Sequence, residues 1–376
     1  MTTVVHMLAA SAAARPDAEA LVCDGARLTY RQYESCVAGF AAELRGAARV
    51  ALLMDNSLDI AIAMFAAQAA GAQVVPLNPA YTDAELAPIL DDADPQVIVA
   101  DPAQAGRGFG RRVIRAGDLT RWANAGLRLT ADLLPDPDSP AALQYTGGTT
   151  GRSKGVALSH RAIATNLIQR HALIPAGPAD RVLSVAPMFH VYAIATGLHL
   201  AAQAGAALVQ MRGYDADALL DLLAAERITL FLGIPRLYGA LLDHPRLARC
   251  ADLRLCLSGS APLPEAVLHR WEAVTGAPIC EGYGQTEAGP ILTYNPASGP
   301  RKPGSVGVAL PETEVEVVDI ATGTIVLPPG EAGEIRARGP QIMSGYRNRP
   351  AETAAALRHG WLHTGDIGTF DADGYL

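Results

Sequence analysis

Short runs of apolar residues alternate with helix-like stretches along the first three quarters of this chain. The runs that are typical of strands cover residues 50–54, 74–77, 97–100, 142–145, 182–186, 207–210, 229–232 and 253–257. Stretches with helical periodicity lie between them, at residues 58–70, 161–171, 216–226 and 264–275. Strands that are apolar on both faces are typical of parallel sheets covered by helices on each side. The alternation therefore predicts an α/β fold of mainly parallel sheets flanked by helices.

The hydrophobic pattern changes after about residue 299. Residues 314–318 and 334–338 alternate between polar and apolar side chains, and Pro328-Pro329-Gly330 marks a turn between them. This alternation indicates strands with one solvated face. We therefore expect residues 299–376 to form a small antiparallel β-barrel or sheet, after a first α/β subdomain at residues 1–175 and a second at residues 176–298.

The composition is that of a globular protein with a large core. The 376 residues are half hydrophobic and carry a formal net charge of −8. The densest stretch of arginines, residues 107–115, is broken by glycines and suits a solvated loop, so no nucleic-acid partner is expected. The five cysteines are scattered without metal-ligand spacing, which favours reduced thiols in a cytoplasmic protein.

One segment, residues 182–211, contains no Asp, Glu, Lys or Arg. Pro187, His190 and Gly197 interrupt it, however, whereas a bilayer-spanning helix needs about 20 mostly apolar residues in succession. We expect a strand, a loop, a buried helix and a second strand here, and no transmembrane segment. The N-terminus also lacks the basic region and apolar stretch of a signal peptide.

The segment Tyr145-Thr-Gly-Gly-Thr-Thr-Gly-Arg-Ser-Lys-Gly155 concentrates glycines, hydroxyls and one lysine between an apolar run and a helix-like stretch. Backbone N–H groups, hydroxyls and a cation in one loop are suited to binding a polyphosphate. The loop is not a Walker A motif, because Lys154 is followed by Gly155 rather than by Ser or Thr. Such clusters are also found in ordinary loops, so its function depends on the motifs that follow.

Four further motifs follow in order: Ser258-Gly-Ser-Ala-Pro-Leu263, Glu281-Gly-Tyr-Gly-Gln-Thr-Glu287, Gly333-Glu-Ile-Arg336 and Gly360-Trp-Leu-His-Thr-Gly-Asp366. Together with the glycine-rich loop they resemble the adenylate-forming superfamily of acyl- and aryl-CoA synthetases, luciferases and peptide-synthetase adenylation domains. Bacterial fatty acyl-CoA synthetases are the most similar group. The resemblance implies a five-layer arrangement of two sheets and a chain that forms the large N-terminal domain. The family's C-terminal lid would follow Leu376, so we expect this fragment to be impaired in catalysis.

The resemblance implies that the enzyme joins a carboxylic acid to ATP as an acyl-adenylate and then forms a coenzyme A thioester, with Mg²⁺. It places the phosphates on Thr146, Gly147, Gly148, Thr149, Thr150, Gly151 and Lys154. Mg²⁺ would bind Glu287 and Thr146, and Thr286 would contact the α-phosphate. The catalytic residues would be Lys154, Thr286, Glu287 and His190. Ser153 stands where the family usually has proline.

The resemblance also places the nucleoside and the acyl group. Adenine would stack on Tyr283, beside the backbone of Ser260, Glu281 and Gly282, and Asp366 would accept hydrogen bonds from the ribose hydroxyls. His190 would face the acyl group. The expected acyl pocket, in which several small residues would leave volume, consists of His190, Tyr192, Ala193, Gly233, Ile234, Gly284, Ala288 and Gly289.

A fatty acid is the expected substrate. No acidic residue lies near Phe231-Leu-Gly-Ile234, although a buried ammonium group would need one as its partner. This argues against an amino acid. An aryl acid, the loading of a carrier protein, and a lidless module that only binds nucleotide or acyl groups remain open alternatives, as does a homodimer.

Overall fold

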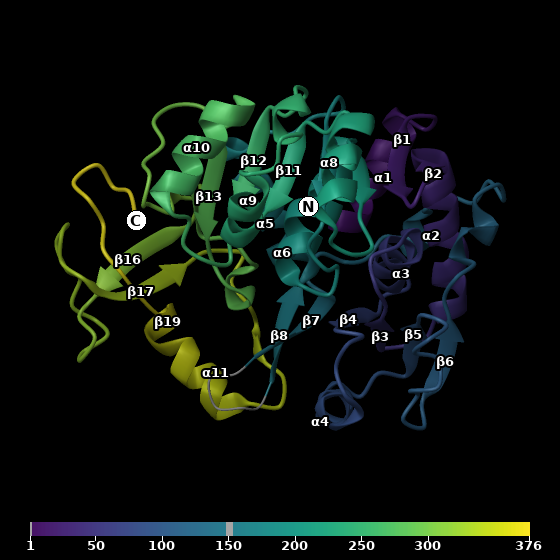
Figure 1. The fold of residues 1–376 in the computed structure, drawn as a ribbon. Coiled ribbons are helices and arrows are strands. Elements are labelled where there is room, and N and C mark those ends of the chain that lie inside the picture. Colours follow the sequence, from purple (N-terminus) through teal and green to yellow (C-terminus); the bar gives the residue numbers. More distant parts are fainter. Residues whose placement is uncertain (1, 148–152) are drawn as a thin grey trace.

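The computed structural model describes residues 2–147 and 153–376, and Figure 1 shows two large sheets with helices around them. The seven-stranded sheet has the order β18-β8-β7-β4-β3-β5-β6. Its strands are β3 (Arg49–Leu53), β4 (Gln73–Leu77), β5 (Val97–Ala100), β6 (Arg112–Arg115), β7 (Pro140–Thr146), β8 (Lys154–Ser159) and β18 (Gly345–Tyr346). Strands β3 to β7 are parallel, whereas β8 runs antiparallel to both of its neighbours, β7 and β18.

The nine-stranded sheet has the order β15-β14-β13-β12-β11-β9-β10-β1-β2. Its strands are β1 (Glu19–Cys23), β2 (Ala26–Thr29), β9 (Arg181–Ser184), β10 (Ala207–Gln210), β11 (Leu230–Gly233), β12 (Leu255–Ser258), β13 (Ile279–Tyr283), β14 (Thr293–Tyr294) and β15 (Val308–Ala309). The six strands from β13 to β1 in this order are parallel to one another.

Neighbouring residues of each central strand enter different cores. In β11, Leu232 faces the core between the two sheets, while Phe231 faces a second core on the outer side. In β3, Val50 faces the shared core and Ala51 faces a third one. Both faces of both sheets are therefore buried, which explains why the strands are apolar throughout.

Helices cover these faces in three layers (Figure 1). The layer between the sheets includes α1 (Val4–Ala14), α2 (Tyr30–Leu44), α3 (Leu58–Ala69) and α5 (His160–Leu173). The outer face of the nine-stranded sheet carries α8 (Ala216–Ala225), α9 (Pro235–Leu241) and α10 (Glu265–Thr275), and that of the other sheet carries α4 (Asp83–Ala93). The predicted five-layer α/β fold is confirmed.

The C-terminal part forms a three-stranded antiparallel sheet from β16 (Glu314–Val318), β17 (Gly333–Arg338) and β19 (Leu362–Gly368). The barrel that we expected here therefore takes the form of an open sheet. Helix α11 (Pro350–Ala356) precedes β19 in the chain.

Each predicted strand run and each predicted helix coincides with an observed element, but the sheets cross the predicted subdomain boundaries. β1 and β2 belong to the nine-stranded sheet although they precede residue 175, and β18 completes the seven-stranded sheet from beyond residue 299. The division at residues 175 and 298 stays a prediction. The sequence analysis also missed several elements, among them β6, whose two apolar residues lie between arginines at a sheet edge.

Residues 182–211 form β9, a loop, a buried helical segment and β10, as predicted. The helical segment consists of α6 (Val191–Ala193), a π-helical turn (Ile194–His199) and α7 (Leu200–Ala204). No helix in the described part of the chain combines the length and apolar character that crossing a membrane would require.

Two buried histidines, His160 and His199, should make the stability of the fold depend on pH. Desolvation, with the charge of nearby Arg170, lowers the pKa of His199 to about 3, and desolvation lowers that of His160 to about 4. Both titrate near 6.5 in an unfolded chain. Between pH of about 6.5 and about 4 the unfolded chain therefore binds more protons, so stability falls as the pH falls, by up to about 1.4 kcal/mol per pH unit for each histidine.

Thermal unfolding at pH 7 and pH 5 tests this expectation. His199→Gln removes one of the two titrating groups, so the variant should lose less stability than the wild type between these pH values. His269→Gln, which changes an exposed histidine, is the control and should behave like the wild type. Equal losses in all three proteins would contradict the assignment.

Candidate active site

A polar cavity of about 680 Å³ lies at the carboxyl ends of parallel strands in the nine-stranded sheet. In open α/β sheets this edge is the usual place for ligands. Segments from both large sheets and from β19 meet there. The cavity brings together most of the predicted residues, namely Thr146, Gly147, Lys154, His190, Tyr192, Ser260, Gly282, Tyr283, Gly284, Thr286, Glu287 and Asp366. Their individual roles stay predictions.

The glycine-rich segment is the connection of a β-hairpin. Thr146, the last residue of β7, pairs with Lys154, the first residue of β8. We expected a helix-like stretch after the loop, but a strand comes first and α5 begins only at His160. Gly148, Thr149, Thr150 and Gly151 lie outside the described residues, so their phosphate contacts also remain predictions. The hairpin places both of its described ends in the cavity.

Glu287 and Lys154 are linked through a tyrosine that the sequence analysis missed. The phenol of Tyr346, on β18, donates a hydrogen bond of 2.8 Å to Oε1 of Glu287. The Lys154 ammonium lies 4.8 Å from the centre of the Tyr346 ring, within the range of a cation–π contact. Tyr346 therefore positions an anion and a cation in the same cavity. No motif in the sequence marks this edge-strand residue.

These groups fit a magnesium ion that is shared with phosphates. Mg²⁺ usually takes one or two carboxylates, keeps several waters and completes its shell with phosphate oxygens. Glu287 supplies one largely buried carboxylate. Across the described residues no group of three or more His, Cys, Asp or Glu side chains could form a cage made only of protein ligands.

Tyr283 and Asp366 meet in the same cavity. The Tyr283 phenol donates a hydrogen bond of 2.7 Å to the Asp366 carboxylate. Burial raises the pKa of Tyr283, and the nearby Asp366 carboxylate raises it further. The phenol therefore keeps its proton, and the exposed carboxylate of Asp366 can accept further hydrogen bonds from a ligand.

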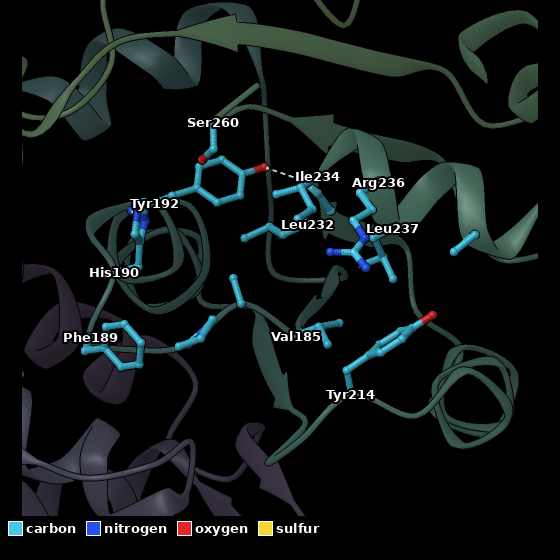
Figure 2. A pocket seen from close by; sticks show the side chains of 14 residues that line it. Val185, Phe189, His190, Tyr192, Tyr214, Leu232, Ile234, Arg236, Leu237 and Ser260 are labelled. Carbon is cyan, nitrogen blue, oxygen red and sulfur yellow. Dashed lines mark hydrogen bonds between the residues drawn. The ribbon is translucent and has the colours of Figure 1, made fainter. Parts of the chain in front are cut away.

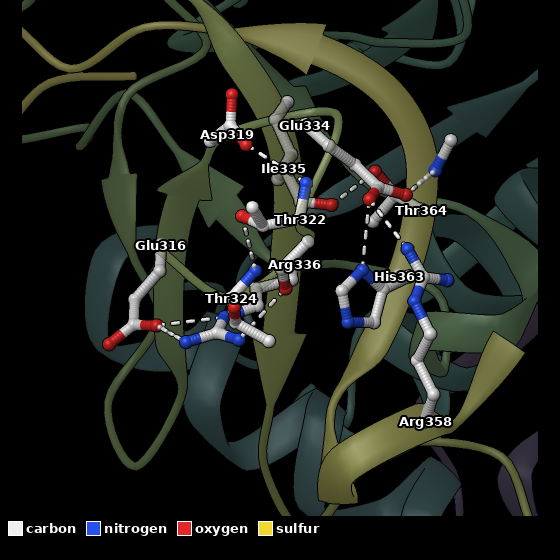
Figure 3. A network of polar contacts seen from close by, with 12 residues as sticks. Glu316, Asp319, Thr322, Thr324, Glu334, Ile335, Arg336, Arg358, His363 and Thr364 are labelled. Atoms are coloured by element: carbon white, nitrogen blue, oxygen red, sulfur yellow. Dashed lines mark hydrogen bonds and ion pairs between the residues drawn. The ribbon is translucent and has the colours of Figure 1, made fainter. Parts of the chain in front are cut away.

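A polar network fixes the segment that carries Asp366 (Figure 3). Glu334 accepts hydrogen bonds from Arg358 at 2.8 Å and from the backbone of Gly365 at 3.3 Å, and His363 Nδ1 lies 2.9 Å from the same carboxylate. Thr364 donates to the Ile335 carbonyl at 2.7 Å. The motifs at residues 333–336 and 360–366 thus form neighbouring strands, and the first of them holds the second.

Ser260 lines the polar cavity, whereas Glu281 supports it from outside. Ser260 has φ +68°, a backbone conformation that is uncommon for residues other than glycine and is often found at functional sites. Glu281 does not line the cavity. Its carboxylate accepts a hydrogen bond of 2.8 Å from the Leu263 backbone, and its carbonyl accepts one from Asn295. Glu281 therefore holds the loop that carries Ser260, and the expected contact of its backbone with adenine stays a prediction.

A second cavity, of about 630 Å³, adjoins the first and is mainly apolar (Figure 2). Both cavities are lined by His190, Tyr192 and Ser260. The Tyr192 hydroxyl is buried and lies within hydrogen-bonding distance of the carbonyls of Gly233 and Leu257. The Tyr192 ring therefore serves as part of the wall, while its polar atom is satisfied within the protein.

His190 lies at the junction of the two cavities. Its Nδ1 accepts a hydrogen bond of 3.2 Å from the backbone of Tyr192, which caps α6. Partial desolvation by the surrounding walls lowers the pKa of His190. An accepting Nδ1 places the proton of the neutral ring on Nε2. His190 can therefore donate a hydrogen bond to an acid from Nε2.

The predicted acyl-pocket residues are only partly placed there. Gly233 and Ile234 line the apolar cavity, and Gly284 lines the polar one. A Cβ atom on Gly233 would lie 2.6 Å from Tyr238, and one on Gly284 would lie 2.0 Å from the Pro290 carbonyl. Close packing therefore requires these glycines, which corrects the expectation that they leave volume for a substrate.

Ala288 and Ala193 are fully buried and line neither of the two cavities, and their role in the acyl pocket stays a prediction. Gly289 lines a separate small cavity. Lining residues that the sequence analysis missed include Val185, Phe189, Tyr214, Arg236 and Leu237. Phe189 and Arg236 follow the carboxyl ends of β9 and β11, so the general rule for α/β sheets could have indicated them.

Comparisons with known proteins agree with this geometry. A family model described as AMP-binding enzyme matches residues 8–347. The long-chain-fatty-acid–CoA ligase of Bacillus subtilis (strain 168) is 33% identical over 425 aligned positions, which cover 100% of this chain and 76% of that protein. A feruloyl-CoA synthase of an Amycolatopsis species is 35% identical over 373 positions, which cover 96% of this chain and 75% of that protein.

A solved structure shows the same fold. The crystal structure of ATP-bound MatB from Rhodopseudomonas palustris matches with a TM-score of 0.90 and 33% identity, covering 99% of this chain and 77% of that one. The family match spans most of the chain, including β7, β8, β13 and β18 around the polar cavity. The chain therefore belongs to the AMP-binding enzyme family.

Proposed function

We propose that this chain activates a fatty acid with ATP and transfers the acyl group to the thiol of coenzyme A. The observation that carries this proposal is the pair of adjoining cavities, one polar and one apolar, that share His190, Tyr192 and Ser260. A nucleotide needs the donors and charges of the first cavity, and an alkyl chain needs the apolar walls of the second. A carboxylate between them would lie beside the Nε2–H of His190.

The reaction brings two anions together. A carboxylate oxygen of the acid attacks the α-phosphorus of ATP, and the bond to pyrophosphate breaks. The thiol of coenzyme A loses its proton to solvent, its sulfur attacks the acyl carbon, and the bond to the phosphate oxygen breaks so that AMP leaves. Fixed donors and cations reduce the repulsion in such steps. Lys154 and Thr286 would contact the phosphates, and Mg²⁺ on Glu287, with Thr146, would neutralise part of their charge.

The nucleoside would occupy the part of the polar cavity near β13 and β19. Tyr283 would stack on adenine beside the Gly282 backbone. Asp366, already held by the Glu334 network, would accept hydrogen bonds from the ribose hydroxyls, for which a carboxylate is a strong acceptor.

An aryl acid is the second candidate substrate. The specific observation in its favour is the 35% identity to a feruloyl-CoA synthase, compared with 33% identity to the Bacillus subtilis fatty-acid ligase. An apolar pocket of about 630 Å³ accommodates either an alkyl chain or a ring. The two candidates differ in how affinity depends on chain length.

A panel of acids separates these substrates. For a fatty-acid pocket, affinity should increase by roughly 0.8 kcal/mol per methylene, because each methylene leaves water, until the pocket is filled. Titration calorimetry in the presence of AMP, with butanoate to hexadecanoate, cinnamate, benzoate and amino acids, measures this. Tightest binding of cinnamate would favour an aryl acid as the substrate. Tightest binding of an amino acid would reject both the fatty acid and the aryl acid.

Glu287→Ala should remove most of the Mg²⁺ dependence of ATP binding, because the ion loses its protein carboxylate. We expect the gain in ATP affinity on adding Mg²⁺ to fall at least about tenfold. Calorimetric titrations with and without Mg²⁺ measure it. Glu352→Ala, an exposed glutamate on α11, is the matched control. An unchanged Mg²⁺ effect in Glu287→Ala would reject the metal assignment.

Asp366→Asn should weaken AMP binding about ten- to hundredfold, because the amide is a weaker acceptor for the ribose hydroxyls and loses the charge. Asp17→Asn is the control. It removes an exposed carboxylate near the N-terminus that does not line the polar cavity, so the affinity for AMP should stay unchanged. The measurement is the dissociation constant of AMP for the three proteins. Equal constants would show that Asp366 does not bind the ribose.

A further inference from the structure

A buried arginine lies behind the wall that the two cavities share. Arg170, on α5, is 1% exposed and donates a hydrogen bond of 2.9 Å from Nη1 to the Ala195 carbonyl. Ala195 belongs to the π-helical turn that directly follows α6, and α6 carries Tyr192. The Tyr192 ring lines both cavities. The guanidinium therefore holds the helical segment that forms this part of the wall.

The same face of α5 also contacts the wall of the polar cavity. Asn166, four residues before Arg170 and so on the same side of the helix, donates a hydrogen bond of 2.8 Å to the Ile291 carbonyl. It also accepts one of 3.2 Å from the Ile291 backbone. Ile291 and Tyr294 line the polar cavity, and the phenols of Tyr294 and Tyr192 lie near enough to act on the charge of Arg170. Arg170 is thus behind this wall and is not a lining residue itself.

No carboxylate pairs with Arg170 in the part of the chain that the structure describes, and its Nε has no hydrogen-bond partner there. Other buried charges have partners: Asp180 lies 2.7 Å from Arg254, and Glu34 lies 2.7 Å from Arg128. Desolvation lowers the pKa of Arg170 to about 10, so the group keeps its charge at neutral pH. A charge that is buried without a counter-ion destabilises a fold. Stability therefore does not explain this arginine.

The polar cavity is a place where such a charge would be useful. Its described lining residues include two carboxylates, Glu287 and Asp366, and one lysine, Lys154. ATP and AMP are anions, so the two carboxylates oppose their binding unless positive charge lies nearby. A guanidinium behind the wall supplies positive charge, and salt and water screen it less than they would screen an exposed group. A bound anion would in turn offset the cost of burying the guanidinium.

We propose that Arg170 is a positioning residue whose buried charge favours anionic ligands in the polar cavity while its hydrogen bond fixes the helical segment that carries Tyr192. This inference rests on the proposed ligase function and adds to it a charged group that acts from behind the wall. The charge should strengthen the binding of a nucleotide with a phosphate but not that of a neutral nucleoside. An arginine with a role in packing alone would affect both ligands alike.

AMP and adenosine form the matched pair of ligands that tests the proposal. Arg170→Met removes the charge and keeps a long apolar side chain. It should bind AMP about tenfold more weakly than the wild type, whereas its affinity for adenosine should change less than about twofold. Titration calorimetry of both ligands at pH 7 measures the two affinities. Adenosine binding also reports whether the site of each variant is folded.

Two further variants of Arg170 separate the charge from the hydrogen bond. Arg170→Gln is neutral but can still donate to a carbonyl, so it should lose AMP affinity as Arg170→Met does. Arg170→Lys keeps a charge and should bind AMP more tightly than either neutral variant. If Arg170→Met does not fold, the comparison of Arg170→Gln with Arg170→Lys decides in the same way. Arg227→Met, which changes an exposed arginine that does not line the polar cavity, is the control and should bind both ligands like the wild type.

Three results would overturn the inference. These are an unchanged AMP affinity in the neutral variants, equal losses of AMP and adenosine affinity, and equal AMP affinities in the Lys and Gln variants. In each case binding of AMP by the wild type would leave the ligase proposal intact. A wild type that binds neither AMP nor adenosine would instead contradict the ligase proposal itself.

Discussion

Burial of both faces of the two large sheets is the constraint on which the rest of the structure depends. Alternate residues of a strand such as β11 enter separate cores, so most side chains of the central strands are apolar. Polar and charged groups are concentrated where strands end. The carboxyl edge of the nine-stranded sheet is therefore where functional side chains accumulate, and the two cavities adjoin there.

The polar cavity is organised by contacts that exist without any ligand. Tyr346 holds Glu287, Tyr283 bonds Asp366, and Glu334 fixes the backbone beside Asp366. Each of these contacts joins segments that are far apart in the sequence. A site held in this way loses little conformational freedom when a ligand binds, so more of the interaction energy is available for affinity.

The sequence predicted the fold and many residues that line the polar cavity, because both leave local signals. Apolar runs marked the central strands, and compact motifs marked Lys154, Glu287 and Asp366. Tyr346 and Arg170 left no such signal, because their importance comes from neighbours brought close only by folding. Gly233 and Gly284 were singled out in the sequence because they are small, but the reason for their size is visible only in the tertiary structure. Tyr238 and Pro290 pack too closely against them to admit a larger side chain. The assignment of β1 and β18 to their sheets depends on pairing over long sequence distances in the same way.

The pairing of β18 with β8 has a consequence for how the protein is made. Val156 and its partner Tyr346 are separated by about 190 residues, so the hairpin that begins the polar cavity leaves the ribosome long before its last neighbouring strand. Glu287 is likewise synthesised before the tyrosine that holds it. A nascent chain therefore carries an incomplete nucleotide site, and a ligand that binds only the finished site cannot stabilise the growing chain until β18 has been synthesised.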